Sequence, residues 1–143
     1  MTLERAARTH VAILLGRNAR LIVQGRKTVE CRLTQTARAP FGKVERGDRI
    51  YFKCTSGPFV ASARAGAVEC VDDLSERALA RLYGKYNDRV CGDEAYWSSK
   101  RKSRYGTFIE LLDVEAVSDG PAMPRSRGCA WFVLGDGVMV KPT

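Results

Sequence analysis

The sequence lacks long hydrophobic runs. Apolar stretches such as Val11 to Leu15 are far too short to cross the roughly 30 Å hydrocarbon core of a bilayer. The first residues also show no apolar signal-peptide region followed by a small-residue cleavage site. We therefore expect a protein without a membrane span, located in the cytoplasm.

Metal-ligand spacing is also missing. The five cysteines stand at positions 31, 54, 70, 91 and 129, and His10 is the only histidine. Zinc sites usually draw on closely spaced cysteine or histidine pairs, so a metal here would need ligands scattered over the whole fold. We expect no metal and no cofactor, and the odd number of cysteines in apolar segments favours reduced thiols.

Acidic residues are scarce relative to basic ones. The chain has 24 Lys and Arg against 16 Asp and Glu, a net charge of +8. Residues 1–50 alone hold 11 basic and 4 acidic side chains. Such an excess favours a polyanionic partner, because cations that displace counterions from phosphates gain affinity without reading sequence. A basic face that serves only solubility is the alternative.

The 143 residues, of which 45% are hydrophobic, have the length of one domain with a real core. We expect a single domain over 1–143, with its core at about 10–134. Apolar or alternating strand patterns occupy His10–Leu15, Thr28–Arg32, Arg49–Cys54, Phe59–Val71, Gly106–Val117 and Cys129–Leu134. Gly66 suggests a bulge in the longest of these segments.

Three short helices are expected between the strands. Asn18 can cap the first, which runs to Gln24, and Asp72 or Asp73 can begin the second, which Gly84 would end. A third helix begins around 92–94. Residues 33–47 show no period and form a long loop. Strands without alternating long helices predict an α+β fold, a small mixed or antiparallel β-barrel of about six strands with short inserted helices.

One ordered set of motifs resembles a known family. Gly25-Arg26-Lys27-Thr28-Val29-Glu30-Cys31-Arg32, followed by Gly47-Asp48-Arg49-Ile50, is similar to the pattern of ASCH domains, which belong to the PUA-like superfamily of small barrels. The order and spacing agree from about His10 to Leu134. The resemblance implies a cleft beside the second strand that holds a nucleobase or nucleotide.

The resemblance also implies residue roles. Some relatives look like amidohydrolases of acylated cytidine, which use a lysine, a threonine three residues later and a helical glutamate. Here the lysine matches Lys27, the glutamate matches Glu94 or Asp93, and Glu30 replaces the threonine. Thr28 is no simple substitute, because it lies directly beside Lys27. The departure at position 30 argues against an acyl-enzyme intermediate.

The position of Lys27 favours a charged, ligand-binding side chain over a catalytic base. It follows a helix C-terminus, whose negative dipole end stabilises an ammonium group, and Glu30 adds to that effect. Lys27 is therefore expected to act as an electrostatic clamp, or else as a solvated strand end. Glu30 and Arg32 share a strand face with Thr28, and these residues either form a plain ion pair or recognise a base amine and a phosphate.

A basic segment flanked by aromatic residues follows the third expected helix. Lys100, Arg101, Lys102 and Arg104 lie between Trp97 and Tyr105. Cations that follow a phosphate backbone and rings that stack on bases suit single-stranded RNA. In the alternative, the two rings are core residues that flank a solvated turn. Trp131 and Phe132 are expected to be core residues.

Two functions follow from these features. The first is an RNA- or nucleotide-binding module with ligand contacts from Lys27, Thr28, Glu30 and Arg32, phosphate contacts from the basic segment and stacking by Trp97 and Tyr105. The alternative is a small hydrolase, acting on a modified cytidine or on RNA, in which Lys27 and Glu94 share proton transfer. DNA remains a possible partner, a protein-interaction module is a third reading, and a monomer is favoured.

Overall fold

The computed structural model describes residues 6–125 and 128–134. The strands are β1 (Thr9–Leu14), β2 (Val29–Thr34), β3 (Arg49–Cys54), β4 (Phe59–Val71), β5 (Tyr105–Ala116) and β6 (Trp131–Leu134). The helices are α1 (Gly16–Val23), α2 (Glu76–Val90) and α3 (Glu94–Ser99). This order agrees with the elements expected from the sequence.

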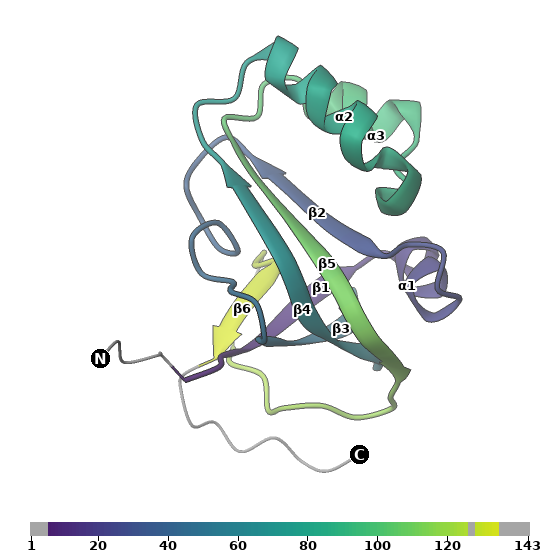
Figure 1. Ribbon diagram of the computed structural model, residues 1–143. Coiled ribbons are helices and arrows are strands. Elements are labelled where there is room, and N and C mark those ends of the chain that lie inside the picture. Colours follow the sequence, from purple (N-terminus) through teal and green to yellow (C-terminus); the bar gives the residue numbers. More distant parts are fainter. Residues whose placement is uncertain (1–5, 126–127, 135–143) are drawn as a thin grey trace.

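The described strands form one sheet in the order β2-β5-β4-β3-β1-β6. The chain passes through α1 and β2 between β1 and β3, which pair in parallel, whereas the other neighbours are antiparallel. The sheet curls strongly along the long strands β4 and β5 (Figure 1). The register of β4 against β5 shifts between Ala65 and Val68, which confirms the bulge at Gly66. The expected α+β fold with a small mixed barrel is confirmed.

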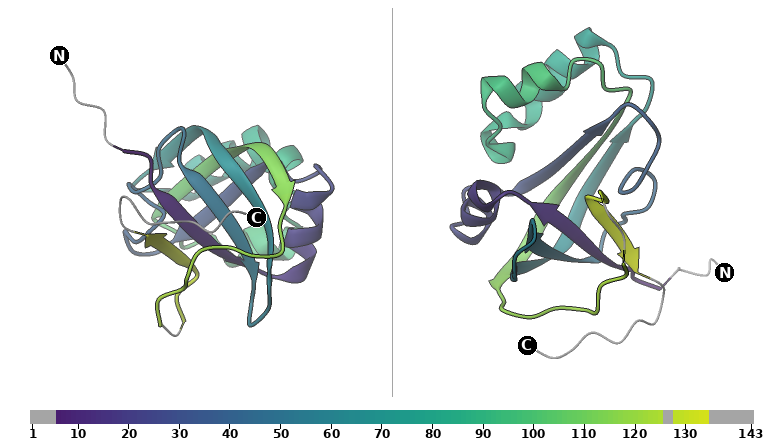
Figure 2. Two further views of the ribbon diagram at one scale, coloured as in Figure 1. Left: turned by 90° about the horizontal axis from the view of Figure 1, so that it is seen from below. Right: turned by 180° about the vertical axis from the view of Figure 1, so that it is seen from behind.

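The two largest apolar clusters lie on opposite sides of this sheet. The first lies inside the curl and contains Ile50, Phe52 and Ile109, all fully buried. The second joins α2 and α3 to the outer faces of β2 and β5. Helix α1 packs Ala19 and Ile22 into the first cluster, whereas the α2–α3 pair packs against the second, at the other end of the long strands (Figures 1 and 2). The structure therefore has a barrel and a helical cap that meet along β2.

The start of the first helix differs from the expectation. Asn18 lies inside α1 and does not cap it, because the helix already begins at Gly16 after Leu15, which makes no side-chain cap bond. Leu15 takes an extended backbone conformation.

The limits of the second helix differ as well. Helix α2 begins at Glu76 behind Ser75, whose hydroxyl accepts the amide hydrogen bond of Ala78, rather than at the aspartates. Gly84 does not end α2, since Leu82 and Tyr86 on either side of it are buried. Burial of that apolar face outweighs the roughly 1 kcal/mol that an interior glycine costs.

The short third helix confirms the predicted start at 92–94. Asp93 is the N-cap residue, and its carboxylate accepts from the amide of Tyr96 at 2.7 Å. No helix within the described residues has the length and apolar character needed to cross a bilayer.

Candidate functional site

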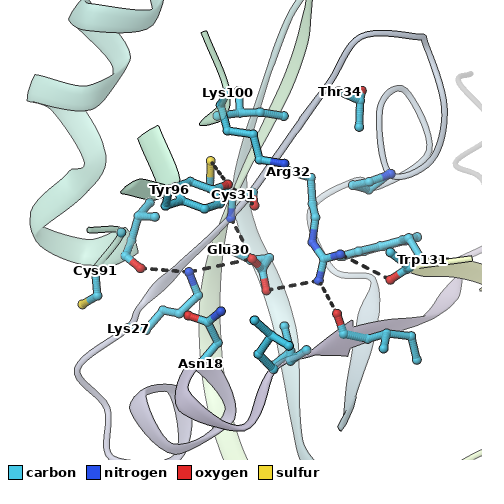
Figure 3. Close-up of a pocket in the computed structure, with 18 of the residues that line it drawn as sticks. Asn18, Lys27, Glu30, Cys31, Arg32, Thr34, Cys91, Tyr96, Lys100 and Trp131 are labelled. Atoms are coloured by element: carbon cyan, nitrogen blue, oxygen red, sulfur yellow. Dashed lines mark hydrogen bonds and ion pairs between the residues drawn. The ribbon is translucent and has the colours of Figure 1, made fainter. Parts of the chain in front are cut away.

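A cavity of about 660 Å³ lies where the barrel meets the helical cap. Its walls come from the end of β1, the start of α1, strand β2, the α2–α3 junction and the segment before β6. Lys27, Glu30 and Arg32 all line it, so the structure brings together three of the four residues expected to bind ligand (Figure 3). Thr28 is half-buried and does not line the cavity.

Lys27 is held at the end of α2. Its side chain is 4% exposed, and Nζ donates to the carbonyl oxygen of Val90, the last residue of that helix, at 2.9 Å. Helix C-terminal carbonyls carry partial negative charge and stabilise an ammonium group. The sequence predicted such a contact with the end of the preceding helix, but the helix that supplies it is α2, 63 residues away.

Glu30 occupies the centre of the cavity wall (Figure 3). Its Oε1 accepts the amide of Cys31 at 2.9 Å and lies 3.8 Å from Lys27 Nζ, and its Oε2 lies 3.7 Å from Arg32 Nη2. These ion-pair distances exceed ordinary hydrogen-bond lengths. Glu30 is only 3% exposed, yet Oε2 has no hydrogen-bond partner among the described residues.

Arg32 is largely engaged by the backbone. Its Nη2 donates to the carbonyl of Ile13 at 3.0 Å and its Nη1 to that of Ala130 at 3.3 Å, while the guanidinium lies 5.2 Å from the centre of the Trp131 ring. The side chain therefore links β2 to β1 and to the segment before β6. These bonds hold two edges of the sheet together beside Glu30.

The thiol of Cys31 and the phenol of Tyr96 lie on the cap side of the cavity. The Tyr96 hydroxyl donates to the Cys31 carbonyl at 3.3 Å and lies 3.5 Å from its Sγ. Burial raises the pKa of the Cys31 thiol to about 12, and the nearby Glu30 charge acts in the same direction. Burial also raises the pKa of Tyr96. Both groups are therefore neutral near pH 7.

The basic segment does not act as one patch. Lys100 lines the cavity, with Nζ 5.6 Å from the centre of the Tyr96 ring. Arg101 pairs with Glu76 at 3.7 Å, Arg104 pairs with Asp73 at 2.5 Å, and the exposed Lys102 does not line the cavity. Of the four residues, only Lys100 reaches the site.

The two aromatic residues expected to stack on bases lie elsewhere. Trp97 is 7% exposed in the second core cluster, and its indole N–H donates to Asn87. This placement agrees with the core alternative for Trp97. Tyr105 is half-buried and packs edge-to-face against Phe41, outside the main cavity.

The two carboxylates weighed for catalysis differ in position. Glu94 is exposed and does not line the cavity, so the structure does not bring it together with Lys27. Asp93 does line the cavity, but its carboxylate caps α3. No group of three or more metal-ligating side chains occurs among residues 6–125 and 128–134.

Trp131 contributes to the site although its sequence pattern indicated only a core residue. It is 4% exposed, lines the cavity and donates its indole N–H to His10 Nδ1 at 3.0 Å. His10 Nε2 in turn lies 2.8 Å from Asp48. Arg17 and Arg38 also line the cavity and were missed. No local spacing identifies them, because Arg17 lies in the first turn of α1 and Arg38 in the loop after β2.

No protein-family model matches the chain, and the curated proteins searched contain no match. Solved structures, in contrast, are similar to the chain. The ASCH structure from Zymomonas mobilis has 21% identity and a TM-score of 0.60, over 76% of this chain and 69% of that one. A serine-to-alanine variant of that protein has 22% identity and a TM-score of 0.62, over 79% of this chain and 73% of that one. A tyrosine-to-phenylalanine variant has 20% identity and a TM-score of 0.59, over 77% of this chain and 75% of that one. At this identity the similarity establishes the fold, and the chain accordingly has the fold of the ASCH proteins, as its motifs implied.

Proposed function

We propose that this protein binds RNA or a nucleotide and holds one base in the cavity beside β2. The observation that carries the proposal is the buried Oε2 of Glu30, which has no hydrogen-bond partner among the described residues. A buried polar atom without a partner costs about 1–3 kcal/mol, and more when it is charged. A ligand that donates a hydrogen bond to Oε2 removes this cost.

The groups around Glu30 determine which hydrogen-bond donors and acceptors such a ligand must present. Glu30 is acceptor-only when ionised, so the ligand must present an N–H or O–H to it. Lys27 Nζ uses one donor on Val90 and keeps others for a ligand acceptor. A base that carries an exocyclic amine beside a ring nitrogen acceptor presents this pair of groups.

The charges around the cavity suit the phosphate of the same ligand. Its lining includes five basic residues and two acidic ones, Glu30 and Asp93. Lys100, Arg17 and Arg38 stand at its wall from three different parts of the chain. Such an excess of cations attracts a phosphorylated ligand and weakens its binding as salt rises.

Substitution of Glu30 by glutamine tests the proposal. The amide of Cys31 still requires an acceptor, so we expect the glutamine oxygen to face it and the NH₂ group to face the cavity. The wall then offers a donor where it offered an acceptor. We expect Glu30→Gln to weaken binding of cytidine monophosphate by about 10- to 100-fold, the worth of a hydrogen bond to a charged group. Uridine monophosphate, which has a carbonyl oxygen at that place, should gain relative to it.

Isothermal titration calorimetry of both nucleotides against both proteins measures this change. The exposed Glu115→Gln serves as the charge-matched control and should leave both affinities unchanged. Equal binding of the two nucleotides before and after the Glu30 substitution would contradict the proposal.

A further inference from the structure

Helix α2 carries a basic stripe on the side that faces away from its core contacts. Arg77, Arg81, Lys85 and Arg89 recur at every fourth position, and all four are exposed. The buried side of the helix is formed by Leu79, Leu82, Tyr86 and Val90. We call the four basic residues the α2 stripe. With a rise of 1.5 Å per residue, it extends for about 18 Å.

Three of the four side chains have no ion-pair partner among the described residues. Arg77 and Arg81 form no ion pair with any described residue. The Arg89 guanidinium lies 5.3 Å from the centre of the Tyr86 ring, which leaves its donors available.

Lys85 is the exception within the stripe. Its Nζ donates to Glu69 at 2.8 Å, and this hydrogen bond lowers the pKa of Glu69. Asp88 is exposed on the same helix and offsets one further charge. The three arginines of the stripe thus keep their donors for an anion, and the stripe together with Glu69 and Asp88 has a net charge of +2.

The stripe ends beside the cavity. The Arg89 carbonyl accepts the amide of Thr28 at 2.9 Å, and Lys27 Nζ reaches the carbonyl of Val90. The Cys91 thiol, which lines the cavity, donates to the carbonyl of Arg26, whose own side chain is exposed. Helix α2 therefore leads from its outer end directly to the proposed binding site, as Figure 1 shows for the helix and β2.

We propose that the α2 stripe binds the phosphate backbone of an RNA strand that continues outward from the cavity. Arginine suits this task, since its planar guanidinium forms paired hydrogen bonds to phosphate oxygens. At about 3.4 Å per nucleotide along one strand, the stripe spans about five nucleotides. This inference rests on the proposed function in one respect, the placement of the first base in the cavity, and it makes a strand rather than a free nucleotide the ligand.

The test compares a short with a long ligand. Wild-type protein and the double variant Arg77→Ala/Arg81→Ala are titrated with cytidine monophosphate and with a cytidine-rich RNA strand of about twelve nucleotides, long enough to cover the stripe. Alanine is a good helix former, so α2 should persist, which circular dichroism checks. We expect an about tenfold loss of affinity for the strand, a salt dependence reduced by about 1.4 in log–log slope, and no change for the mononucleotide.

The control is Arg46→Ala/Arg49→Ala, which removes the same charge from exposed residues before and at the start of β3. Equal losses in both double variants, or no loss in the α2 variant, overturn the inference. If the strand binds through the stripe while cytidine monophosphate fails to bind the wild type, the cavity proposal fails and the stripe remains. If neither ligand binds the wild type, both proposals fail.

Discussion

Cys31 is buried beside the cavity, with its thiol against the hydroxyl of Tyr96. The folded protein holds the thiol pKa at about 12, compared with 9.0 for the free group. The unfolded chain loses this proton once the pH passes 9.0, whereas the folded protein keeps it. Proton release then favours the unfolded state. The stability that the protonated Cys31 thiol contributes is therefore fully present below pH 9.0 and is lost as the pH rises towards 12.

We therefore expect the free energy of unfolding to fall between pH 9 and 11, with up to about 1.4 kcal/mol per pH unit from this thiol. The raised pKa of Tyr96 adds to the loss above its usual range. Urea denaturation at several pH values measures the slope, and Cys31→Ala should make it shallower. An unchanged slope in that variant would show that the thiol does not titrate differently in the two states.

At the scale of single elements, the α2–α3 junction shows how neighbouring acidic residues have different tasks. Asp93 caps α3 through the amide of Tyr96, whereas Glu94 only occupies the first helical turn. Replacing an N-cap residue with alanine lowers the free energy of unfolding by about 1 kcal/mol. An exposed substitution elsewhere usually changes it by less than about 0.5 kcal/mol. The cap also sets the position of Tyr96 on the cavity wall.

We expect Asp93→Ala to lower the free energy of unfolding by about 1 kcal/mol and Glu94→Ala to lower it by less than about half of that. Chemical denaturation of both variants measures the difference. A larger effect of Glu94→Ala would point to a role for that carboxylate which the contacts of α3 do not show.

Across the whole molecule, Arg32 connects parts that are far apart in the sequence. Its two hydrogen bonds to Ile13 and Ala130 join β2, at one edge of the sheet order, to the β1–β6 edge. The carbonyls of Ile13 and Ala130 would lose these donors if the side chain were shortened. Barrel closure and the charge next to Glu30 thus depend on the same side chain.

Arg32→Lys keeps the charge but cannot make both bonds, because an ammonium group lacks the planar fork of the guanidinium. We expect the free energy of unfolding to fall by about 1–3 kcal/mol, from two weakened hydrogen bonds beside a buried carboxylate. Arg64→Lys is the matched control, since Arg64 forms an exposed pair with Asp113 that is worth about 0–1 kcal/mol. Equal losses in thermal or urea denaturation would mean that Arg32 does not close the barrel.

Much of the fold could be predicted because strand signals are local. Alternation in β2 correctly separated Glu30 and Arg32 from Val29 and Cys31, and the apolar run before Gly16 gave β1. The extension of α2 past Gly84 could not be predicted from local signals, because its stabilisation comes from packing onto β2 and β5. The free energy that Gly84 costs inside a helix is smaller than the free energy gained by burying the apolar face of α2.

The sequence by itself determined the order of elements, the basic excess and the shared strand face of Glu30 and Arg32, since these depend on composition and periodicity. A cleft that also includes Lys27 was implied by the family resemblance. Only the tertiary structure decided that Lys27 bonds to Val90, that Arg32 is held by Ile13 and Ala130, and that Lys100 rather than its basic neighbours faces the cavity. The physical reason is that each of these contacts joins elements whose relative placement is set by the packing of the two cores. No local pattern encodes that placement.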